Sequence, residues 1–397
     1  MRPNISLIPR FNIDYGFHDF LSGLSATVLQ KESSFDILRS EFRTPDIFFA
    51  NYSRTSICLI LKSLGLPAGS RVGVPLYSCT VVFDAIINAG LVPKFIDINE
   101  NYTLDPEDLK LKVGDIDALI VIHTFGRLAD LDEIKRIAPD IPIIEDCAHS
   151  IFSLYKGKQA GTIGDFSSFS LPKYLSAGGG GMVFVNNTSY VENLSECMDS
   201  LEHSSFTEEL KHLLIMYARA FFYHRPWFGL LALPIGLSVE GKVDLMDKTS
   251  FDIKSINRSD LHVAVKKIRS FQNIVKIQRT NSLLLIKELA DTPYALPTEQ
   301  ENTCCNYYLF PLQVATEGMR DQVCDYLREN GVDTSKLFSQ TPEIARAKYG
   351  YEGDCPHTEK VADRIFTVPN HYTLKEKELL KIARLLKGFC SSGSMHV

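Results

Sequence analysis

The stretch GDFSSFSLPKYLSAGGGGMVFVNN, residues 164–187, places a single lysine, Lys173, between small hydroxyl residues and a run of four glycines. Upstream, residues 141–150 read IPIIEDCAHS, an apolar run that leads into two acids, and Asp146 lies 27 residues (173 − 146) before Lys173. Near-continuous apolar runs are typical of buried parallel strands, and open α/β sheets bind ligands where such strands end. Glycines let the backbone turn tightly before a further strand. We therefore expect Lys173 and Asp146 to meet at one edge of a parallel sheet.

The two side chains together indicate a pyridoxal phosphate site. Such an enzyme needs an amine that holds the aldehyde as a Schiff base, and a carboxylate that keeps the pyridine nitrogen protonated. Lys173 and Asp146 fit these two roles. An aspartate at the end of a strand and a lysine before glycines are each common, so the prediction depends on finding both in this context.

Several segments, in this order along the chain, resemble a known family. The most specific are EDCAHS (145–150), GTIGDFSSFSLPK (161–173) and the glycine run with its following strand. Weaker matches lie at residues 74–98, 121–134, 331–338 and 365–374. From about Phe48 to Leu386 the chain resembles the nucleotide-sugar aminotransferases of the DegT/StrS family, which are fold-type-I pyridoxal phosphate enzymes. The resemblance implies an α/β fold with a mostly parallel, seven-stranded sheet flanked by helices and a small α+β C-terminal domain.

The hydrophobic pattern agrees with that fold. Helix-like and strand-like periods alternate over residues 51–146, which predicts a parallel sheet with crossover helices. A long amphipathic helix is predicted over residues 259–289, followed by short strand-like and helix-like segments. We expect a large cofactor-binding domain at residues 1–245 and a small C-terminal domain at 246–397 with a disordered tail. The large domain includes an N-terminal arm of about residues 1–45 and a hydrophobic insert of about residues 208–240.

A phosphate dianion binds well at a helix N-terminus, where backbone N–H groups are free. Ser53, Arg54 and Thr55 stand at the start of the first long predicted helix, where the family carries its phosphate-binding pair. Arg54 departs from the family, although a guanidinium is also a suitable phosphate partner. The alternative is an ordinary Ser/Thr helix cap. Ser168, five residues before Lys173, matches the family serine that bonds the same phosphate.

The resemblance assigns further cofactor contacts. His149, three residues after Asp146, matches a position beside the phenolic oxygen of the cofactor. Cys79 stands where the family has an aromatic residue stacked on the pyridine ring, so either the thiol or the neighbouring Tyr77 covers that ring. Asn257, in KSINRSDLH, corresponds to a segment that completes the phosphate site of a partner subunit, which implies a homodimer.

The activity implied by the resemblance is transamination. An amino group moves from L-glutamate or L-glutamine to a keto sugar, nucleotide-linked, in surface polysaccharide or secondary-metabolite biosynthesis. The cofactor passes through its pyridoxamine phosphate form, and Lys173 acts as general base. Family dehydratases resemble this chain but carry a histidine at the lysine position, so Lys173 argues against that activity. A non-catalytic sensor or regulatory protein of the same fold is a further alternative, which the presence of Lys173, Asp146 and Ser168 disfavours.

Composition limits the partners. A net charge of −6 gives no basic surface for nucleic acid. Nine cysteines at irregular spacings are typical of reduced thiols, and the adjacent Cys304 and Cys305 lack the second pair of a zinc site. The first residues contain no apolar core of signal-peptide length, so we expect a cytoplasmic protein.

One apolar segment departs from the family. Residues 213–237 read LLIMYARAFFYHRPWFGLLALPIGL, where Arg219, His224, Arg225 and Pro226 interrupt a run that is otherwise long enough for a membrane span. A buried helical hairpin or a dimer-interface insert is the simpler interpretation. The alternative is a surface that rests on a membrane and recognises a lipid-linked or otherwise hydrophobic ketone.

Overall fold

Strand-forming runs of the sequence assemble into one large sheet in the computed structural model, which describes residues 4–31, 33–42, 44, 46–175, 178–240 and 249–391. In the described part of the chain this sheet has seven strands, in the order β1-β9-β8-β5-β4-β2-β3. They are β1 (Ile47–Ala50), β9 (Gly181–Val185), β8 (Phe166–Ser170), β5 (Ile143–Asp146), β4 (Ala118–Ile122), β2 (Arg71–Pro75) and β3 (Val92–Ile96). The five strands from β8 to β3 are parallel, whereas β9 is antiparallel to both of its neighbours. The predicted mostly parallel, seven-stranded sheet is confirmed.

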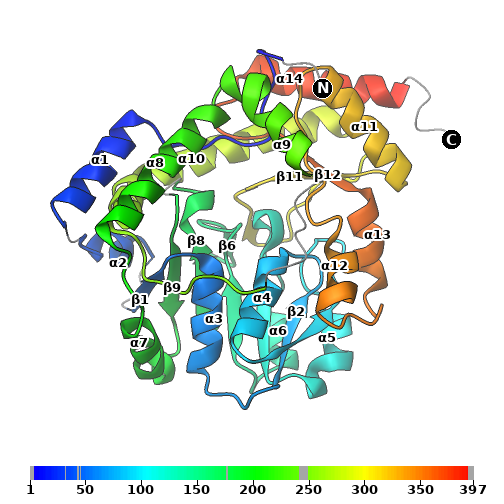
Figure 1. Cartoon of the computed structure of the whole chain (residues 1–397). Coiled ribbons are helices and arrows are strands. Elements are labelled where there is room, and N and C mark those ends of the chain that lie inside the picture. Colours follow the sequence, from blue (N-terminus) through cyan, green and yellow to red (C-terminus); the bar gives the residue numbers. More distant parts are fainter. Residues whose placement is uncertain are drawn as a thin grey trace.

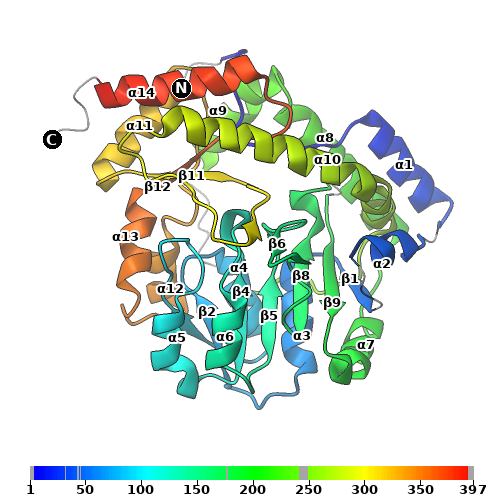
Figure 2. The same ribbon diagram turned by 180° about the vertical axis from the view of Figure 1, so that it is seen from behind.

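Helices cover both faces of the sheet, which explains the unbroken apolar runs of its strands. In β4, Leu119 and Val121 pack in one hydrophobic cluster, while Ala118, Ile120 and Ile122 pack in the other. One face carries α3 (Ser53–Ser63), α4 (Thr80–Asn88) and α7 (Val191–Asp199) (Figure 1). The opposite face carries α5 (Pro106–Lys112) and α6 (Leu131–Ile137), seen in Figure 2. The side chains of β4 therefore contribute to two cores.

The strand register gathers several chain segments at one edge of the sheet. Asp146, the last residue of β5, pairs with Ser168 of β8, and Ser170 pairs with Gly181 of β9. Gly181 also pairs with Ala50, so β1 ends at the same edge and leads directly into α3. The short 3₁₀ turn Leu171–Lys173 follows β8 at this edge. Lys173, Asp146 and the first turn of α3 therefore lie on the same side of the sheet.

Close approach of α3 to the sheet requires a residue without a side chain at position 181. A Cβ on Gly181 would lie 2.3 Å from the Ser56 Oγ and 2.4 Å from the Tyr52 carbonyl oxygen. Any larger residue would push the first turn of α3 away from β9. The last glycine of the run thus sets the distance between the sheet and the helix N-terminus.

The segment that follows the large sheet forms α8 (Phe206–Tyr223), a π-helical turn (Phe228–Ala232) and α9 (Leu233–Glu240). Leu213 and Ala220 of α8 are buried against the N-terminal helix α1 (Phe17–Val28) and the start of α10. A second N-terminal helix, α2 (Asp36–Phe42), packs on the sheet. No helix in the described ranges is both long and apolar enough to cross a membrane.

The long amphipathic helix predicted from the sequence is α10 (Arg258–Leu289). Its first half packs on the main sheet through Ala264, Ile268 and Phe271. Its last turns, with Leu285 and Leu289, belong to the C-terminal cluster. The helix therefore spans both parts of the molecule (Figure 2).

The C-terminal part of the chain contains a two-stranded antiparallel sheet and helices, as expected for a small α+β unit. Its elements are β11 (Phe310–Gln313), α11 (Glu317–Glu329), α12 (Thr341–Lys348), α13 (Pro356–Arg364), β12 (Ile365–Val368) and α14 (Glu376–Ser391). A further small sheet joins β10 (Thr303–Cys304) to β6 (Leu154–Tyr155) and β7 (Lys158–Gln159). The predicted division between residues 245 and 246 lies outside the described residues. The predicted disordered tail, residues 391–397, lies outside them as well except for Ser391, which is the last residue of α14.

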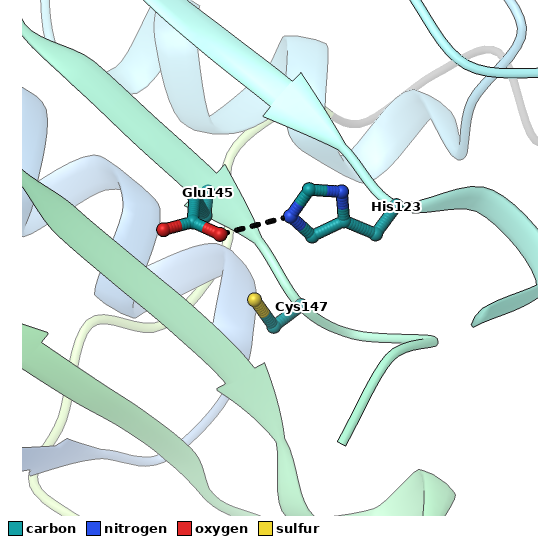
Figure 3. A group of neighbouring side chains, drawn as sticks. All are labelled: His123, Glu145 and Cys147. Carbon is teal, nitrogen blue, oxygen red and sulfur yellow. Dashed lines mark hydrogen bonds and ion pairs between the residues drawn. The ribbon is translucent and has the colours of Figure 1, made fainter. Parts of the chain in front are cut away.

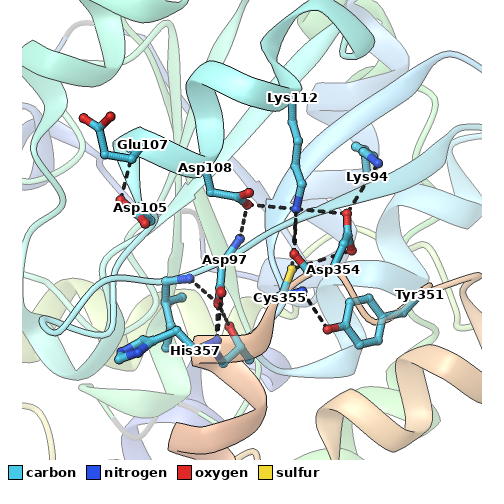
Figure 4. A network of polar contacts seen from close by, with 12 residues as sticks. Lys94, Asp97, Asp105, Glu107, Asp108, Lys112, Tyr351, Asp354, Cys355 and His357 are labelled. Carbon is cyan, nitrogen blue, oxygen red and sulfur yellow. Dashed lines mark hydrogen bonds and ion pairs between the residues drawn. The ribbon is translucent and has the colours of Figure 1, made fainter.

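A polar network fastens α13 to the main sheet (Figure 4). The carboxylate of Asp97, one residue after β3, accepts the backbone N–H groups of His357 at 2.9 Å and Thr358 at 2.7 Å, and the Thr358 hydroxyl at 2.7 Å. Cys355, the residue at the helix cap, provides no side-chain cap. Asp97 thus caps a helix that lies about 260 residues away along the chain. Near it, the ammonium group of Lys112 contacts Asp108 at 2.8 Å and Asp354 at 3.0 Å.

Replacing Asp97 with alanine should lower the free energy of unfolding by about 2 kcal/mol, since a helix cap is lost and buried donors remain unsatisfied. Urea unfolding followed by circular dichroism measures this change. Asp325→Ala, which removes an exposed ion pair with Arg328, serves as the control and should change stability by less than about 0.5 kcal/mol. Equal effects of the two substitutions would contradict the role of Asp97.

Candidate active site

Lys173 faces the best-defined cavity at the edge of the sheet. The cavity has a volume of about 290 Å³ and is lined largely by apolar and aromatic side chains, among them Tyr174, Phe271 and Tyr308. Lys173 projects into it, so its side chain keeps solvent-accessible surface although protein surrounds it. The protein that surrounds the Lys173 amine removes water from it and so lowers its pKa, while the nearby Asp146 and Cys79 act in the opposite direction. A larger fraction of the amine is therefore neutral and able to act as a nucleophile or base.

Asp146 is buried at the end of β5, with 4% of its surface exposed. One carboxylate oxygen, Oδ1, accepts the backbone N–H of Ala148 at 2.9 Å. Burial raises the pKa of Asp146, and the charge of Lys173 and the Ala148 N–H partly offset that effect. A cationic partner stabilises the ionised form of a buried carboxylate. Asp146 is therefore suited to pair with a protonated ring nitrogen.

His149 is held as a neutral ring with a defined tautomer. Its Nδ1 accepts the backbone N–H of Phe125 at 3.2 Å, which leaves the proton on Nε2. The ring stacks on Tyr308 with a centroid distance of 4.7 Å and an interplanar angle of 25°. Burial, aided by the charge of Lys173, holds the pKa of His149 well below its usual range. His149 can thus donate a hydrogen bond from Nε2 to an anionic oxygen.

The first turn of α3 fits a phosphate group. Tyr52, the residue before the helix, has extended backbone angles and provides no side-chain cap. The Ser168 Oγ lies 2.9 Å from the Ser53 Oγ, so two hydroxyls meet beside the backbone N–H groups of the first turn of α3. Thr55 is turned away, since its hydroxyl donates to the Asn51 Oδ1 at 2.6 Å. Free N–H groups and paired hydroxyls suit a dianion.

Cys79 and Tyr77 differ in their relation to Lys173. Cys79 is the N-cap residue of α4 and lies close enough for its charge to affect the pKa of Lys173. Tyr77 is fully buried, and its hydroxyl donates to the Leu337 carbonyl oxygen at 2.9 Å. Of the two candidates for the residue above the ring, Cys79 has the more suitable position.

Arg54 and Asn257 line a second, more polar cavity of about 550 Å³ and do not line the cavity of Lys173. The Arg54 guanidinium lies over the rings of Tyr52, at 4.9 Å, and Phe251, at 5.2 Å. Direct phosphate contacts by Arg54 within one chain, or by Asn257 across a dimer, stay predictions.

Much of the cavity wall was not identified from the sequence. It comes from the N-terminal arm, α8, α10 and two C-terminal loops. These residues include Asn12, Arg219, Gln278, Asn306, Tyr308, Asn370 and Tyr372. The only signal in the sequence was the family-like stretch 365–374, which contains Asn370 and Tyr372.

His123, Glu145 and Cys147 form a compact buried group beneath the site (Figure 3). The Glu145 carboxylate accepts four N–H groups: His123 Nε2 at 2.9 Å, Gly161 at 2.9 Å, Ile163 at 2.8 Å and Gly164 at 2.5 Å. The Nδ1 of His123 accepts the backbone N–H of Ala129 at 3.3 Å. Because hydrogen bonds already occupy the ligand atoms of His123 and Glu145, the group acts as a structural anchor.

Comparison with known proteins identifies the relatives of this arrangement. The model of the DegT/DnrJ/EryC1/StrS aminotransferase family matches residues 50–212 and 256–387. GDP-perosamine synthase from Vibrio cholerae is 23% identical over 340 residues, which cover 83% of each chain. L-glutamine:2-deoxy-scyllo-inosose aminotransferase from Streptoalloteichus tenebrarius is 30% identical over 145 residues, 35% of this chain and 34% of that protein. The Streptococcus pneumoniae protein Spr1654, a sugar aminotransferase by its description, was solved in a PLP form. Its structure superposes with a TM-score of 0.76 at 17% sequence identity and covers 97% of this chain and 99% of that chain. This similarity confirms the predicted fold.

Replacing Glu145 with glutamine should lower the free energy of unfolding at neutral pH by about 3 kcal/mol, because the new NH₂ group would face backbone N–H donors. Burial alone would raise the pKa of Glu145, yet the bonds from His123, Gly164 and Gly161 hold it below its usual value. The stabilisation is therefore present above the unfolded-state pKa of about 4.3 and is lost as the pH falls through the lower folded-state pKa. Urea unfolding between pH 3 and 7 should show a difference in unfolding free energy between wild type and variant that is constant above about pH 5 and narrows below it.

The control for this measurement is Glu133→Gln, at an exposed ion pair with Arg136. It should leave stability nearly unchanged at neutral pH. A Glu145→Gln protein as stable as this control would show that the four hydrogen bonds do not anchor the site.

Proposed function

Because this chain belongs to the DegT/DnrJ/EryC1/StrS aminotransferase family, we propose that it transfers an amino group from L-glutamate or L-glutamine to a keto sugar carried on a nucleotide. The family match confirms the enzyme class predicted from the sequence, a pyridoxal phosphate-dependent aminotransferase. The proposed donor and acceptor are of the kinds named in the two relatives, a GDP-sugar synthase and an L-glutamine-dependent aminotransferase. A role in polysaccharide or secondary-metabolite biosynthesis in the cytoplasm follows as part of this proposal.

The observation that carries the proposal is the meeting of Lys173, Asp146 and His149 at one edge of the sheet. Bound pyridoxal phosphate supplies an electron-withdrawing ring, which acidifies the carbon that bears the substrate amine. Asp146 would hold the ring nitrogen protonated, and the Nε2–H of His149 would donate to the phenolic oxygen. Ser168 and the first turn of α3 would hold the phosphate.

Lys173 is the group that moves the proton. Its amine, with a pKa lowered by burial, would take up and release the proton that amino transfer moves between substrate and cofactor. Amino transfer in two halves requires the pyridoxamine phosphate form between them. Dehydratases of the family resemble this site but carry a histidine in place of Lys173, so amino transfer is the better assignment.

A second acceptor class, a lipid-linked or hydrophobic ketone, is favoured by one observation. The exposed side chains of the α8 to α9 segment form an apolar ridge, which we define as Leu214, Ile215, Phe221, Phe222, Trp227 and Leu231. Clustered exposed aromatic and aliphatic side chains are typical of contact with a membrane surface or with another protein. The same ridge is a candidate for the interface of the predicted homodimer, in which Asn257 would reach the phosphate site of a second copy.

Lys173→Ala should abolish amino transfer from L-glutamate, measured as 2-oxoglutarate release, because both the covalent attachment of the cofactor and the proton transfer are lost. In the wild type, borohydride reduction followed by peptide mass spectrometry should place the pyridoxyl group on Lys173. Lys158→Ala, at an exposed strand residue, should behave as wild type. Full turnover by Lys173→Ala, or labelling of another lysine, would sink the assignment.

If the acceptor is lipid-linked, the protein should float with phosphatidylglycerol-containing vesicles in a density gradient. The double variant Ile215→Ser, Leu231→Ser should then remain at the bottom of the gradient, whereas Leu111→Ser, at an exposed leucine of α5, should float as wild type does. A wild type that stays at the bottom, with the double variant eluting later than wild type in size-exclusion chromatography, would assign the ridge to a dimer interface instead.

A further inference from the structure

Most of the charged groups around the cavity of Lys173 are already neutralised. The Arg10 guanidinium binds both carboxylate oxygens of Asp333, at 2.6 and 3.0 Å. Asp14 pairs with the ammonium group of Lys267 at 2.9 Å. His371 also lines the cavity, and burial lowers its pKa to about 4, so it is neutral near pH 7. Among the described residues, the remaining charged side chains of the cavity wall are Lys173 and Arg219, and neither is in an ion pair there.

Arg219 is held at the cavity by the packing of α8. Met216, one turn earlier on the same helix, lines the same cavity. The Arg219 guanidinium lies 5.8 Å from the centre of the Tyr223 ring, and that ring stacks on Phe11, another wall residue, at 5.1 Å. Cation–π contact and a stacked support restrict where the guanidinium can lie.

The glycine run fixes how closely this helix approaches Lys173. A Cβ on Gly178 would lie 2.5 Å from the Met216 Cγ, and a Cβ on Gly179 would lie 2.7 Å from the Asp260 Oδ2. The absence of side chains at these positions lets α8 and the start of α10 pack against the segment that follows Lys173. Arg219 is therefore part of the wall of the active site.

An amino donor brings a carboxylate to this cavity. Once Lys173 is committed to the cofactor, Arg219 is the remaining unpaired cation of the described wall, and a guanidinium binds a carboxylate through two parallel hydrogen bonds. We propose that Arg219 binds a carboxylate of the amino donor, an inference that rests on the proposed aminotransferase function and makes Arg219 a specificity-determining residue.

The proposal changes the role of the segment that contains α8. The sequence pattern marks it as an apolar insert with interrupting charges. One of these charges, Arg219, lines the cavity of Lys173, and the same segment carries the exposed apolar ridge. The insert thus contributes to substrate recognition as well as offering a contact surface.

The test uses the holoenzyme and two measurements. The first is the half-reaction with L-glutamate, followed by the loss of visible absorbance of bound pyridoxal phosphate. Arg219→Met should raise the half-saturating concentration of L-glutamate about 10- to 100-fold, with a smaller change in limiting rate, because a charge-assisted hydrogen bond is lost. The half-saturating concentration of L-glutamate for Arg219→Lys should lie between those of wild type and Arg219→Met. The second measurement is calorimetric binding of glutarate, a dicarboxylate without an amine, which should weaken by a similar factor.

Lys211→Met is the matched control, since Lys211 is an exposed cation on α8 that lines neither cavity. It should leave both measurements unchanged. Unaltered L-glutamate saturation and glutarate binding in Arg219→Met would overturn the proposal while leaving the aminotransferase function intact. A wild type that binds glutarate with Arg219-dependence but does not react with L-glutamate would uphold the binding role and reject L-glutamate as donor. If Lys211→Met and Arg219→Met weakened L-glutamate saturation and glutarate binding equally, the loss of a positive charge anywhere on α8 would explain the result. That outcome would reject the assignment.

Discussion

The buried carboxylate of Glu145 is the constraint on which the active site depends. An ionised carboxylate removed from water is costly unless hydrogen bonds replace its hydration. Four N–H donors do so here, three of them from the loop at residues 161–164 and one from His123. The loop at residues 161–164 leads directly into β8, so the contacts that hold it around Glu145 also help to fix the position of Ser168 and Lys173. Because successive strand residues point to opposite faces, holding Glu145 on one face of the sheet also orients Asp146 on the other.

The sequence was sufficient for most of the fold because its signals are local. Unbroken apolar runs such as residues 118–122 predicted buried parallel strands, and the structure has β4 there. The amphipathic pattern of residues 259–289 predicted α10 with nearly the observed bounds, Arg258–Leu289. The small sheet of β6, β7 and β10 was not predicted, because it joins two-residue strands from distant parts of the chain. Such strands have no period that a sequence pattern can reveal.

The site was predictable where a residue directly follows a strand and less so where packing sets its direction. Lys173 and Asp146 belong to the first class, since strand ends determine their positions. The directions of Tyr77 and Arg54 belong to the second, because a cluster around Leu337 and a pair of aromatic rings decide them. Arg219 could not be assigned from sequence for the same reason: only the rotation of α8 against α1 and α10 shows which of its side chains face the cavity.

Helix α10 is shared by the main sheet and the C-terminal cluster, and this limits how its length can change. Its first half is built into the core of the main sheet and its last turns into the C-terminal cluster. One residue inserted between those halves would rotate everything beyond it by about 100° and advance it by about 1.5 Å. The loops carrying Asn370 and Tyr372 would then leave the cavity wall. A change in the length of this helix would therefore misalign the two parts of the molecule that together form the cavity wall.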